Sequence, residues 1–337
     1  MTALHDRWTA HMNANPRARA RDAAAALGVS EAALIDGACG VEAIRLSSDW
    51  GPLLGALRTL GEVMALTRNE AAVHEKIGVW EGLTLRGPHG VVYGGPIDLR
   101  IFPRTWRYAF AVQRPGPRGP RRSLQFFDAH GDAVHKVHLR EGSNVDAFDA
   151  LVGRFREDDA GPVAPSPRPA PEPPDLARVD AEAVLADWAA LQDTHDFHAM
   201  LRRSKCPRRH AVHLAEGRFS RRVAADAPTR ALEQAAAAAL PIMIFVPNPG
   251  CIQIHSGPVE TIRPIGPWIN VLDPGFNLHL RADLVDEAWV VRKPTRDGEV
   301  TALELFDAEG GLIALLFGVR KEGQAEDEGW RALLAGL

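Results

Sequence analysis

The chain has 337 residues with a formal net charge of −4, and its apolar fraction of 46 % and charged fraction of 24 % are ordinary for a folded, water-soluble protein. These values exclude a mainly disordered chain, and the acidic balance argues against a protein that coats nucleic acid. Because it has three widely separated cysteines, no apolar run near 18 residues and no signal-peptide pattern at its start, we expect a cytoplasmic protein of about two domains.

The first half of the chain predicts helices followed by antiparallel strands. Alanine-rich helical segments are expected at Arg17–Leu27, Ser30–Gly37 and Gly51–Leu66. Alternating apolar and polar residues, separated by turn residues, predict strands at Val79–Leu85, Ile97–Phe102, Trp106–Gln113, Ser123–Phe127 and Ala133–Leu139. A helix over Asn144–Phe155 is expected to end this half.

A proline-rich segment stands near the middle of the chain. Seven of the 25 prolines fall between Pro162 and Pro174. Because proline fixes φ and lacks an N–H donor, Gly161–Asp175 predicts an extended tether rather than a helix or a central strand. We therefore expect a first half over 1–160, a linker over 161–175 and a second half over 176–337.

The second half has the same order of elements as the first. Helices are expected within Asp180–Lys205 and over Thr229–Leu240, strands follow, and a helix over Glu328–Leu334 ends the chain. A shift of 179 residues places SLQFFDAHGDAV (Ser123–Val134) on ALELFDAEGGLI (Ala302–Ile313) without a gap, and the shared FDA-x-G core predicts a hairpin in each copy. The pattern predicts an α+β tandem duplication, each half with a large antiparallel β-sheet plus flanking helices.

Two histidines form the first candidate site. The segment Trp188–Arg203 predicts an amphipathic helix with an apolar face of Phe197, Met200 and Leu201. His195, His198 and Arg202 share an adjacent face. Asp193 is expected to cap the helix, which puts His195 in the first turn, where the helix dipole disfavours imidazolium. A neutral imidazole suits a metal ligand, but the spacing alone favours two solvent-exposed histidines.

Arg100 is the second candidate. In the predicted strand Ile97–Phe102, apolar residues alternate onto one face, while Asp98, Arg100 and Phe102 lie on the other. An arginine beside a phenylalanine suits an anionic aromatic ligand, through charge and ring contact. The strand by itself favours a solvated surface arginine. The equivalent residue in the second half is His279, so the two copies have diverged chemically.

Basic residues on apolar strands are the third candidate group. The basic regions are Arg292–Asp297 and Phe317–Lys321. In a strand, Lys293 shares one face with Trp289 and Val291. Arg320 likewise shares a face with Leu316 and Gly318. Such side chains are costly on apolar faces unless an anion meets them. That anion is either a ligand or an acidic residue of this chain, and the pattern leaves both open.

Two segments have weak features of nucleic-acid binding. Ala20–Ile35 has a helix–glycine–helix pattern. Its second helix is short and acidic, however, and it lacks an arginine or asparagine that could read bases. The basic cluster Arg202–His210 is one patch on an acidic protein. We expect a plain helical hairpin and no stable nucleic-acid binding.

Five segments together resemble a known family, the hemin-degrading and cytoplasmic haem-trafficking proteins of Gram-negative haem-uptake systems. The segments are Leu60–Gly82, Ile97–Val112, Ser123–Leu139, Asp193–Leu201 and Leu316–Gly323. The resemblance covers nearly the whole chain, including the duplication. It implies two similar halves with large antiparallel sheets and haem bound in a cleft.

The resemblance also implies a role for individual residues. His195, in the D-T-H motif, corresponds to the axial ligand of the haem iron. Arg100 in IDLR and Arg320 in FG-x-R correspond to catalytic arginines on the distal side. Many members have phenylalanine at the position of His198, and a second imidazole three residues from the ligand would offer an alternative axial ligand. Other expected haem contacts are Phe102, Arg208, Phe317 and, near the propionates, Lys293.

The resemblance implies haem degradation in the cytoplasm, by oxygen-dependent ring opening with release of iron. Distal arginines would stabilise developing negative charge, and a reductase, NAD(P)H or ascorbate would supply electrons. The alternative is a haem chaperone or storage protein whose partners are a separate haem oxygenase or an inner-membrane haem transporter. A remote alternative is a haem-responsive DNA-binding regulator. Degradation and delivery need the same pocket, so the sequence does not separate them.

Overall fold

The computed structural model describes residues 2–117, 119–170, 173–320 and 323–337. Their strands join in two nine-stranded antiparallel sheets with flanking helices, which confirms the α+β class. The chain divides into two compact units. Unit 1 contains Met1–Arg68, Glu75–Pro169 and Asn248–Gln253, and unit 2 contains Asn69–His74, Ala170–Pro247 and Ile254–Leu337. Each half of the sequence therefore gives one short segment to the unit that the other half mainly builds.

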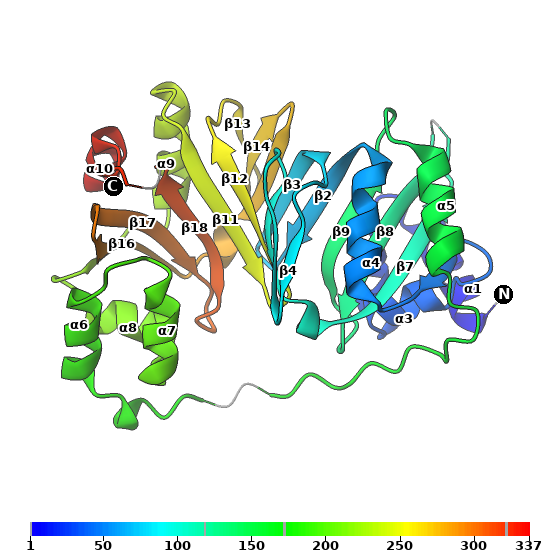
Figure 1. Ribbon diagram of the computed structural model, residues 1–337, viewed down its shortest axis with the longest axis horizontal. Helices are drawn as coiled ribbons and strands as arrows, with labels where there is room; N and C mark the ends of the chain where they lie inside the picture. The colour runs from blue at the N-terminus through cyan, green and yellow to red at the C-terminus, as the bar shows by residue number, and fades with distance from the viewer. Residues whose placement is uncertain (1, 118, 171–172, 321–322) are drawn as a thin grey trace. The chain divides into compact units, whose positions relative to one another are not determined.

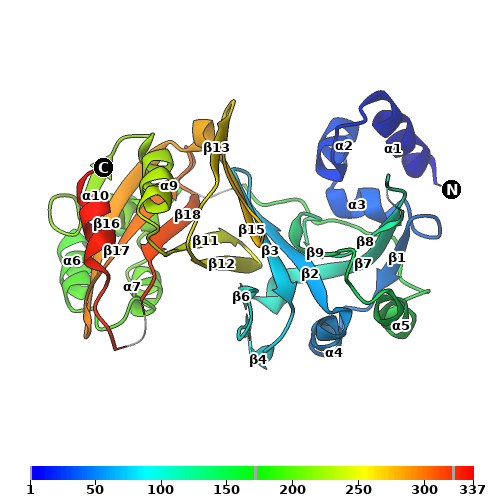
Figure 2. The same ribbon diagram turned by 90° about the horizontal axis from the view of Figure 1, so that it is seen from above.

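Unit 1 has a main run of strands with helices on both faces. The run is, in order, β1 (Ala43–Leu46), β7 (Trp106–Arg114), β8 (Arg121–Asp128), β9 (Ala133–Leu139), β2 (Glu62–Arg68) and β3 (Ala72–Val79). A second run goes from the start of β12 (Cys251–Gly257) to β6 (Asp98–Ile101), β5 (His89–Val92) and β4 (Thr84–Arg86). One face of β7 and β8 packs on α1 (Ala3–Ala14), α2 (Ala20–Leu27) and α3 (Glu31–Asp36), and the other packs towards α4 (Trp50–Ala56) and α5 (Val145–Phe155) (Figure 2).

Unit 2 repeats this arrangement. Its main run is β10 (Ser220–Val223), β16 (Glu287–Thr295), β17 (Gly298–Phe306), β18 (Leu312–Gly318), β11 (Ile242–Asn248) and β12. A second run goes from the start of β3 to β15 (Phe276–Arg281), β14 (Trp268–Asp273) and β13 (Ile262–Ile265). One face of β16 and β17 carries α6 (Ala181–Ala189), α7 (Asp196–Arg203) and α8 (Arg208–Leu214), and the other face packs with α9 (Ala227–Ala237) and α10 (Glu328–Ala335) (Figure 1).

The duplication is visible in the hydrogen bonds as well as in the order of elements. Shifted by 179 residues, β9 coincides with β18. The amide nitrogen Nδ2 of Asn69 donates to the carbonyl oxygens of Pro247 (3.0 Å) and Ile313 (2.8 Å). The amide of Asn248, 179 residues later, donates over the same two distances to the equivalent carbonyls, those of Arg68 and Val134.

The two predicted hairpins are confirmed. The backbone N–H of Gly131 donates to the carbonyl of Asp128, and that of Gly310 donates to the carbonyl of Asp307. Both glycines have left-handed backbones, with φ of 81° and 85°. This conformation disfavours residues with a Cβ atom, which explains the glycine in the FDA-x-G pattern.

The proline-rich segment Gly161–Asp175 has no helix or strand in its described residues, which exclude 171–172. Its first part is held on unit 1 (Figure 1). The backbone N–H of Val163 donates to the Asp36 carboxylate at 2.9 Å, and that of Ser166 donates to the carbonyl of Ala129 at 2.8 Å. The described residues of the segment are extended, as predicted, and its beginning is anchored on unit 1.

Several element boundaries differ from the prediction. Gly51–Leu66 is not one helix, because α4 ends at Ala56, a 3₁₀ turn follows, and β2 begins at Glu62. Gly61, with φ of 69° and ψ of −144°, ends the helical region. Val79–Leu85 is mostly irregular, and α1 was not predicted. Among the described residues, none of the helices is long and apolar enough to span a membrane.

Candidate functional site

Helix α7 carries the histidine pair as the sequence predicts. Its apolar face is buried in unit 2, through Phe197, Met200 and Leu201. The N-cap residue is His195 rather than Asp193, so the helix begins two positions later than expected, and the His195 side chain is 87 % exposed. His198, one turn later, is also exposed. Both imidazoles therefore project from the polar face of the helix.

Asp193 fixes the orientation of His195. Its Oδ1 accepts the backbone N–H of His195 at 2.8 Å and lies 2.6 Å from the ring nitrogen Nδ1. The backbone hydrogen bond from His195 lowers the pKa of Asp193, and the ring hydrogen bond and the charge of Arg320 add to this while partial burial opposes it. Because a carboxylate only accepts, the proton of a neutral His195 ring lies on Nδ1, which leaves the lone pair on Nε2. Arg320 lies within electrostatic reach of the same carboxylate.

His198 is held in its neutral form by its surroundings. Partial burial lowers its pKa, and the positive charges of Arg202 and Arg208 lower it further. A neutral imidazole has a nitrogen lone pair available to a metal ion. His198 therefore has the protonation state that an alternative ligand needs.

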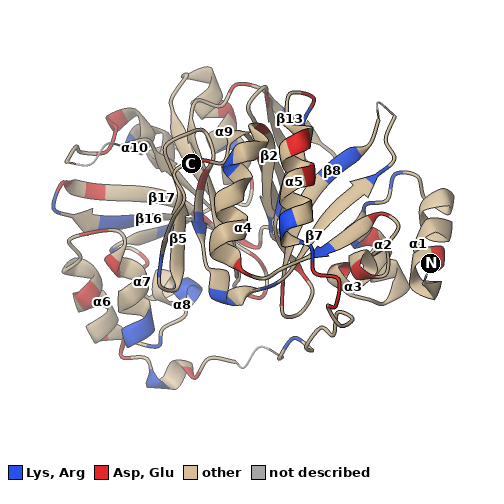
Figure 3. Ribbon diagram, turned by 45° about the vertical axis from the view of Figure 1, so that its right-hand side comes forward, with Lys and Arg blue, Asp and Glu red and all other residues tan. Residues whose placement is uncertain are grey.

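A buried cluster of charges lies on the other side of α7. Glu304 on β17 is fully buried, and the Lys293 side chain on β16 is 3 % exposed. Lys293 Nζ lies 2.7 Å from Glu304 Oε1, and Arg208 donates from Nε and Nη2 to the two carboxylate oxygens, each at 2.7 Å. Arg208 lies on α8 and Lys293 on β16, and both elements carry blue, basic segments in Figure 3. The cluster has two cations and one carboxylate, so its net charge is positive.

The pKa values of this cluster follow from burial and charge together. Burial alone would raise the pKa of Glu304, but the charges and hydrogen bonds of Arg208 and Lys293 lower it to about 2. Burial lowers the pKa of Lys293 to about 8, although Glu304 opposes this effect. At neutral pH both groups are charged. The sequence left open whether Lys293 meets a ligand or an acidic residue of this chain. In the structure it meets an acidic residue, Glu304.

Aromatic rings connect the cluster to α7 and to the sheet. The Phe197 ring lies under Lys293 Nζ (4.6 Å to the centroid) and Arg208 Cζ (5.1 Å). Phe317 on β18 lies 5.9 Å from Lys293 Nζ. These cation–ring contacts fix α7 relative to the strands beneath it.

A partly exposed apolar surface lies beside the cluster on the same face of the sheet. Met243 is paired with Phe317 across β11 and β18, and Phe245 is paired with Leu315. All four are only partly buried, and Leu315 is in turn paired with Glu304. Unit 2 thus offers a flat apolar surface bordered by basic groups.

Arg100 and Phe102 lie in unit 1, on the strand face that the sequence predicts. Leu99 and Ile101 are buried in the core, while Arg100 and Phe102 are partly exposed. Arg100 forms an ion pair with Asp98, two residues earlier on the same face, and burial raises the pKa of Asp98 although Arg100 opposes this. In this structure Arg100 therefore meets an acidic residue of its own strand.

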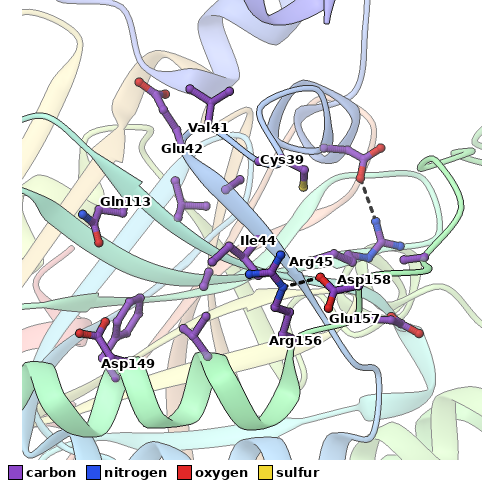
Figure 4. A pocket seen from close by; sticks show the side chains of 18 residues that line it. Cys39, Val41, Glu42, Ile44, Arg45, Gln113, Asp149, Arg156, Glu157 and Asp158 are labelled. Atoms are coloured by element: carbon purple, nitrogen blue, oxygen red, sulfur yellow. Dashed lines mark hydrogen bonds and ion pairs between the residues drawn. The ribbon is translucent and has the colours of Figure 1, made fainter. Parts of the chain in front are cut away.

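Unit 1 also has a cavity of about 600 Å³ between β1, β7 and α5 (Figure 4). Its walls include Asp149 and Glu157, and Arg45, which is paired with Asp36 at 3.2 Å. None of the residues predicted from the sequence lines it. It is a feature separate from the candidate site.

The structure groups most of the predicted residues. His195, His198, Arg208, Lys293, Phe317 and Arg320 all lie in unit 2 and are connected through Asp193, Phe197 and Glu304. Lys321 of the predicted basic strand is outside the described residues. Glu304 was not predicted, although a glutamate between two leucines in the buried part of a strand was a signal. Within the described ranges, no cluster of three His, Cys, Asp or Glu residues fits a bare metal ion.

The chain is similar to known proteins over nearly its whole length. A family model described as the haemin-degrading HemS/ChuX domain matches residues 28–155 and 205–337, one block in each half. The hemin transport protein HemS of Yersinia enterocolitica is 41 % identical over 324 residues, which cover 96 % of this chain and 94 % of that protein. Holo-PhuS, a heme-binding protein from Pseudomonas aeruginosa, has a TM-score of 0.95 and 45 % identity over 98 % of this chain and 96 % of its own. The heme-degrading enzyme ChuS of Escherichia coli O157:H7 has a TM-score of 0.93 and 37 % identity over 99 % and 98 % of the two chains.

Proposed function

The chain belongs to the haemin-degrading HemS/ChuX-domain family, and on that premise we propose that it binds haem through His195 and degrades it by oxygen-dependent ring opening with release of iron. The observation that carries the proposal is the His195–Asp193 pair. The carboxylate holds the Nδ1 edge of this exposed imidazole, so the opposite edge, with Nε2, is open to an incoming iron. Haem is the substrate or cargo in this proposal, and its iron and porphyrin supply the redox chemistry.

The surface beside His195 suits the rest of the haem molecule. The porphyrin is flat and apolar, and the partly exposed row that contains Phe245 and Phe317 is an apolar surface of that kind. The two propionates are anionic, and the cluster of Lys293 and Arg208 keeps a positive excess over Glu304. We therefore propose Lys293, Arg208 and Phe317 as haem contacts.

Arg100 and Arg320 are the proposed catalytic residues. Their guanidinium groups would donate hydrogen bonds to the developing negative charge on the distal side and so favour attack on the porphyrin ring. Arg100 has to share or leave its ion pair with Asp98 to do so. We propose Phe102 as an apolar wall beside it. The division of labour, with residues 1–160 supplying Arg100 and 176–337 supplying His195, is part of this proposal.

Delivery of intact haem is the second candidate function. It is favoured by the 41 % identical relative that is described as a hemin transport protein, and by His198, whose neutral imidazole gives the iron a second position for ligand exchange. The proposed partners are then a separate haem oxygenase or an inner-membrane haem transporter. For degradation, the partner is an electron donor such as a reductase with NAD(P)H, or ascorbate.

Turnover separates the two functions. Haem-loaded protein is mixed with ascorbate, with and without catalase, which removes free peroxide. Loss of the Soret band that persists with catalase supports degradation. Loss that catalase abolishes supports delivery, because free peroxide then attacks the porphyrin without help from the protein.

Hemin titration tests the ligand. We expect His195→Ala to lose the histidine-ligated Soret spectrum and most of the affinity, and His11→Ala, on α1 in unit 1, to behave as wild type. If only the His195→Ala/His198→Ala double variant loses binding, the two histidines share the role. An unchanged spectrum and affinity in both His195→Ala and the double variant would refute the assignment.

A further inference from the structure

We infer that Asp193 is a positioning residue for haem binding: its carboxylate selects the ring tautomer of His195 and aims Nε2 at the iron. The inference deepens the proposed function and rests on it. It concerns a side chain that the family resemblance does not assign. It also predicts a property of the protein before any haem is bound.

Asp193 makes two hydrogen bonds with His195, one with its backbone and one with its ring. The same oxygen, Oδ1, is 2.8 Å from the backbone nitrogen of His195 and 2.6 Å from ring nitrogen Nδ1. The first contact anchors the carboxylate to the N-terminal end of α7. The second fixes the rotation of the ring relative to that anchor. Together they set the direction in which the opposite ring edge points.

The hydrogen bond from the ring to Asp193 matters because few neighbouring side chains pack against the His195 ring. The His195 side chain is 87 % exposed, so no surrounding core holds the ring in one rotamer. An exposed side chain loses rotational freedom when it becomes a ligand, which costs binding free energy. A ring already held by Asp193 has lost most of that freedom in the unliganded protein.

The tautomer is the second consequence. A carboxylate has no proton to donate, so the short contact requires the hydrogen on Nδ1. The lone pair is then on Nε2, which points away from Asp193. A carboxylate on the far nitrogen also makes the ligating nitrogen more basic, as in other carboxylate–histidine–metal arrangements, where loss of the carboxylate typically costs about 10- to 100-fold in metal affinity.

The chain offers matched variants. Asp193→Asn keeps a side-chain oxygen that accepts the backbone N–H of His195, but it removes the negative charge. Asp193→Ala removes both contacts. Asp196→Asn is the control, because Asp196 carries the same charge on the first helical residue of α7 and is exposed. A merely structural role for Asp193 predicts that Asp193→Asn behaves as wild type.

The experiment begins without haem. Long-range ¹H–¹⁵N correlation of histidine-labelled protein at one fixed pH is expected to show His195 protonated on Nδ1 in the wild type and in Asp196→Asn. We expect a shift towards the Nε2-protonated form in Asp193→Ala. An unchanged tautomer in Asp193→Ala would overturn the inference, whatever the protein does with haem.

Hemin titration and redox titration complete the test. Asp193→Asn and Asp193→Ala are expected to bind hemin about 10- to 100-fold more weakly than Asp196→Asn. Their bound iron is expected to be easier to reduce, because a less basic imidazole stabilises the ferric state less. If His195→Ala loses binding while both Asp193 variants match the wild type in affinity and potential, the inference fails and the proposed function stands. If both His195→Ala and the His195→Ala/His198→Ala double variant bind hemin as the wild type does, the proposed function fails instead.

Discussion

Replacing Glu304 by glutamine tests the buried charge cluster most directly. The carboxylate is fully buried and receives three contacts of 2.7 Å from Lys293 and Arg208. Glutamine keeps the shape of the side chain but removes the charge, and its NH₂ group faces two cations. Lys293, with a side chain 3 % exposed, would then lack its counter-charge in a nearly dry environment.

Two lines of reasoning give the same magnitude. Removing one partner of a buried ion pair typically costs about 3–5 kcal/mol, because the remaining charge is left uncompensated. Independently, the lowering of the Glu304 pKa from 4.5 to about 2 corresponds to about 3 kcal/mol of stabilisation at neutral pH. We therefore expect Glu304→Gln to lose about 3 kcal/mol in the free energy of unfolding.

Urea denaturation at pH 7, followed by circular dichroism and tryptophan fluorescence, measures this loss. The matched control is Glu299→Gln on the same strand, whose contact with Arg292 is 3.6 Å long and joins side chains that are 46 % and 45 % exposed. That variant should lose less than about 1 kcal/mol. A Lys293→Met/Glu304→Leu double variant should recover much of the stability, because it removes the unpaired lysine charge. If Glu304→Gln loses no more than Glu299→Gln, the reasoning about the cluster is wrong.

Three further predictions concern pH, one glycine and the duplicated asparagines. The pKa of Glu304 in the folded protein, about 2, is below its ordinary 4.5. The stabilisation of the folded state by this carboxylate is therefore complete above pH 4.5 and is lost as the pH falls towards 2. Urea midpoints measured against pH should show this slope in the wild type and a weaker slope in Glu304→Gln. Gly82→Ala should lower the melting temperature strongly, because its Cβ would lie 1.7 Å from a backbone oxygen at φ of 68°, whereas Gly87→Ala, at φ of 59° in open space, should cost only about 1 kcal/mol. Asn69→Ala and Asn248→Ala each lose two donated and two accepted hydrogen bonds. Chemical denaturation should therefore show that each variant loses about 2–4 kcal/mol in the free energy of unfolding. A loss in only one of the two variants would contradict the equivalence of the two networks.

Local patterns predicted well those features that local chemistry determines. The FDA-x-G turns, the apolar face of α7 and the alternation around Arg100 all depend on neighbours within a few residues, and the structure has them where expected. The prediction of one helix over Gly51–Leu66 was wrong because its many apolar residues concealed a change from helical to strand periodicity at Gly61. After that glycine, burial alternates residue by residue, as in a strand with one covered face.

The candidate site was predictable only in part, for a physical reason. Glu304 meets Arg208 across 96 positions of the sequence, and no local period reveals such a pair. Asp193 was expected to cap α7, and it does bond the backbone of His195, but its second bond to the ring depends on a rotamer that the sequence does not specify. His195 and Lys293 were candidates from the sequence, whereas the contacts that Asp193 and Glu304 make with them became visible only in three dimensions.

The exchange of short segments between the units has a consequence for how the protein is made. Unit 1 lacks Asn248–Gln253 until translation has passed Gln253, although the rest of it ends at Pro169, within the proline-rich segment. At about 5–20 residues per second, residues 170–253 take roughly 4–17 s to synthesise. During that interval the nascent unit 1 has β6 without its neighbour β12, and unpaired strand edges of this kind bind other chains. A ribosome that pauses within the second half would therefore leave an aggregation-prone intermediate, and severing the chain in the proline-rich segment would give two fragments that are each incomplete.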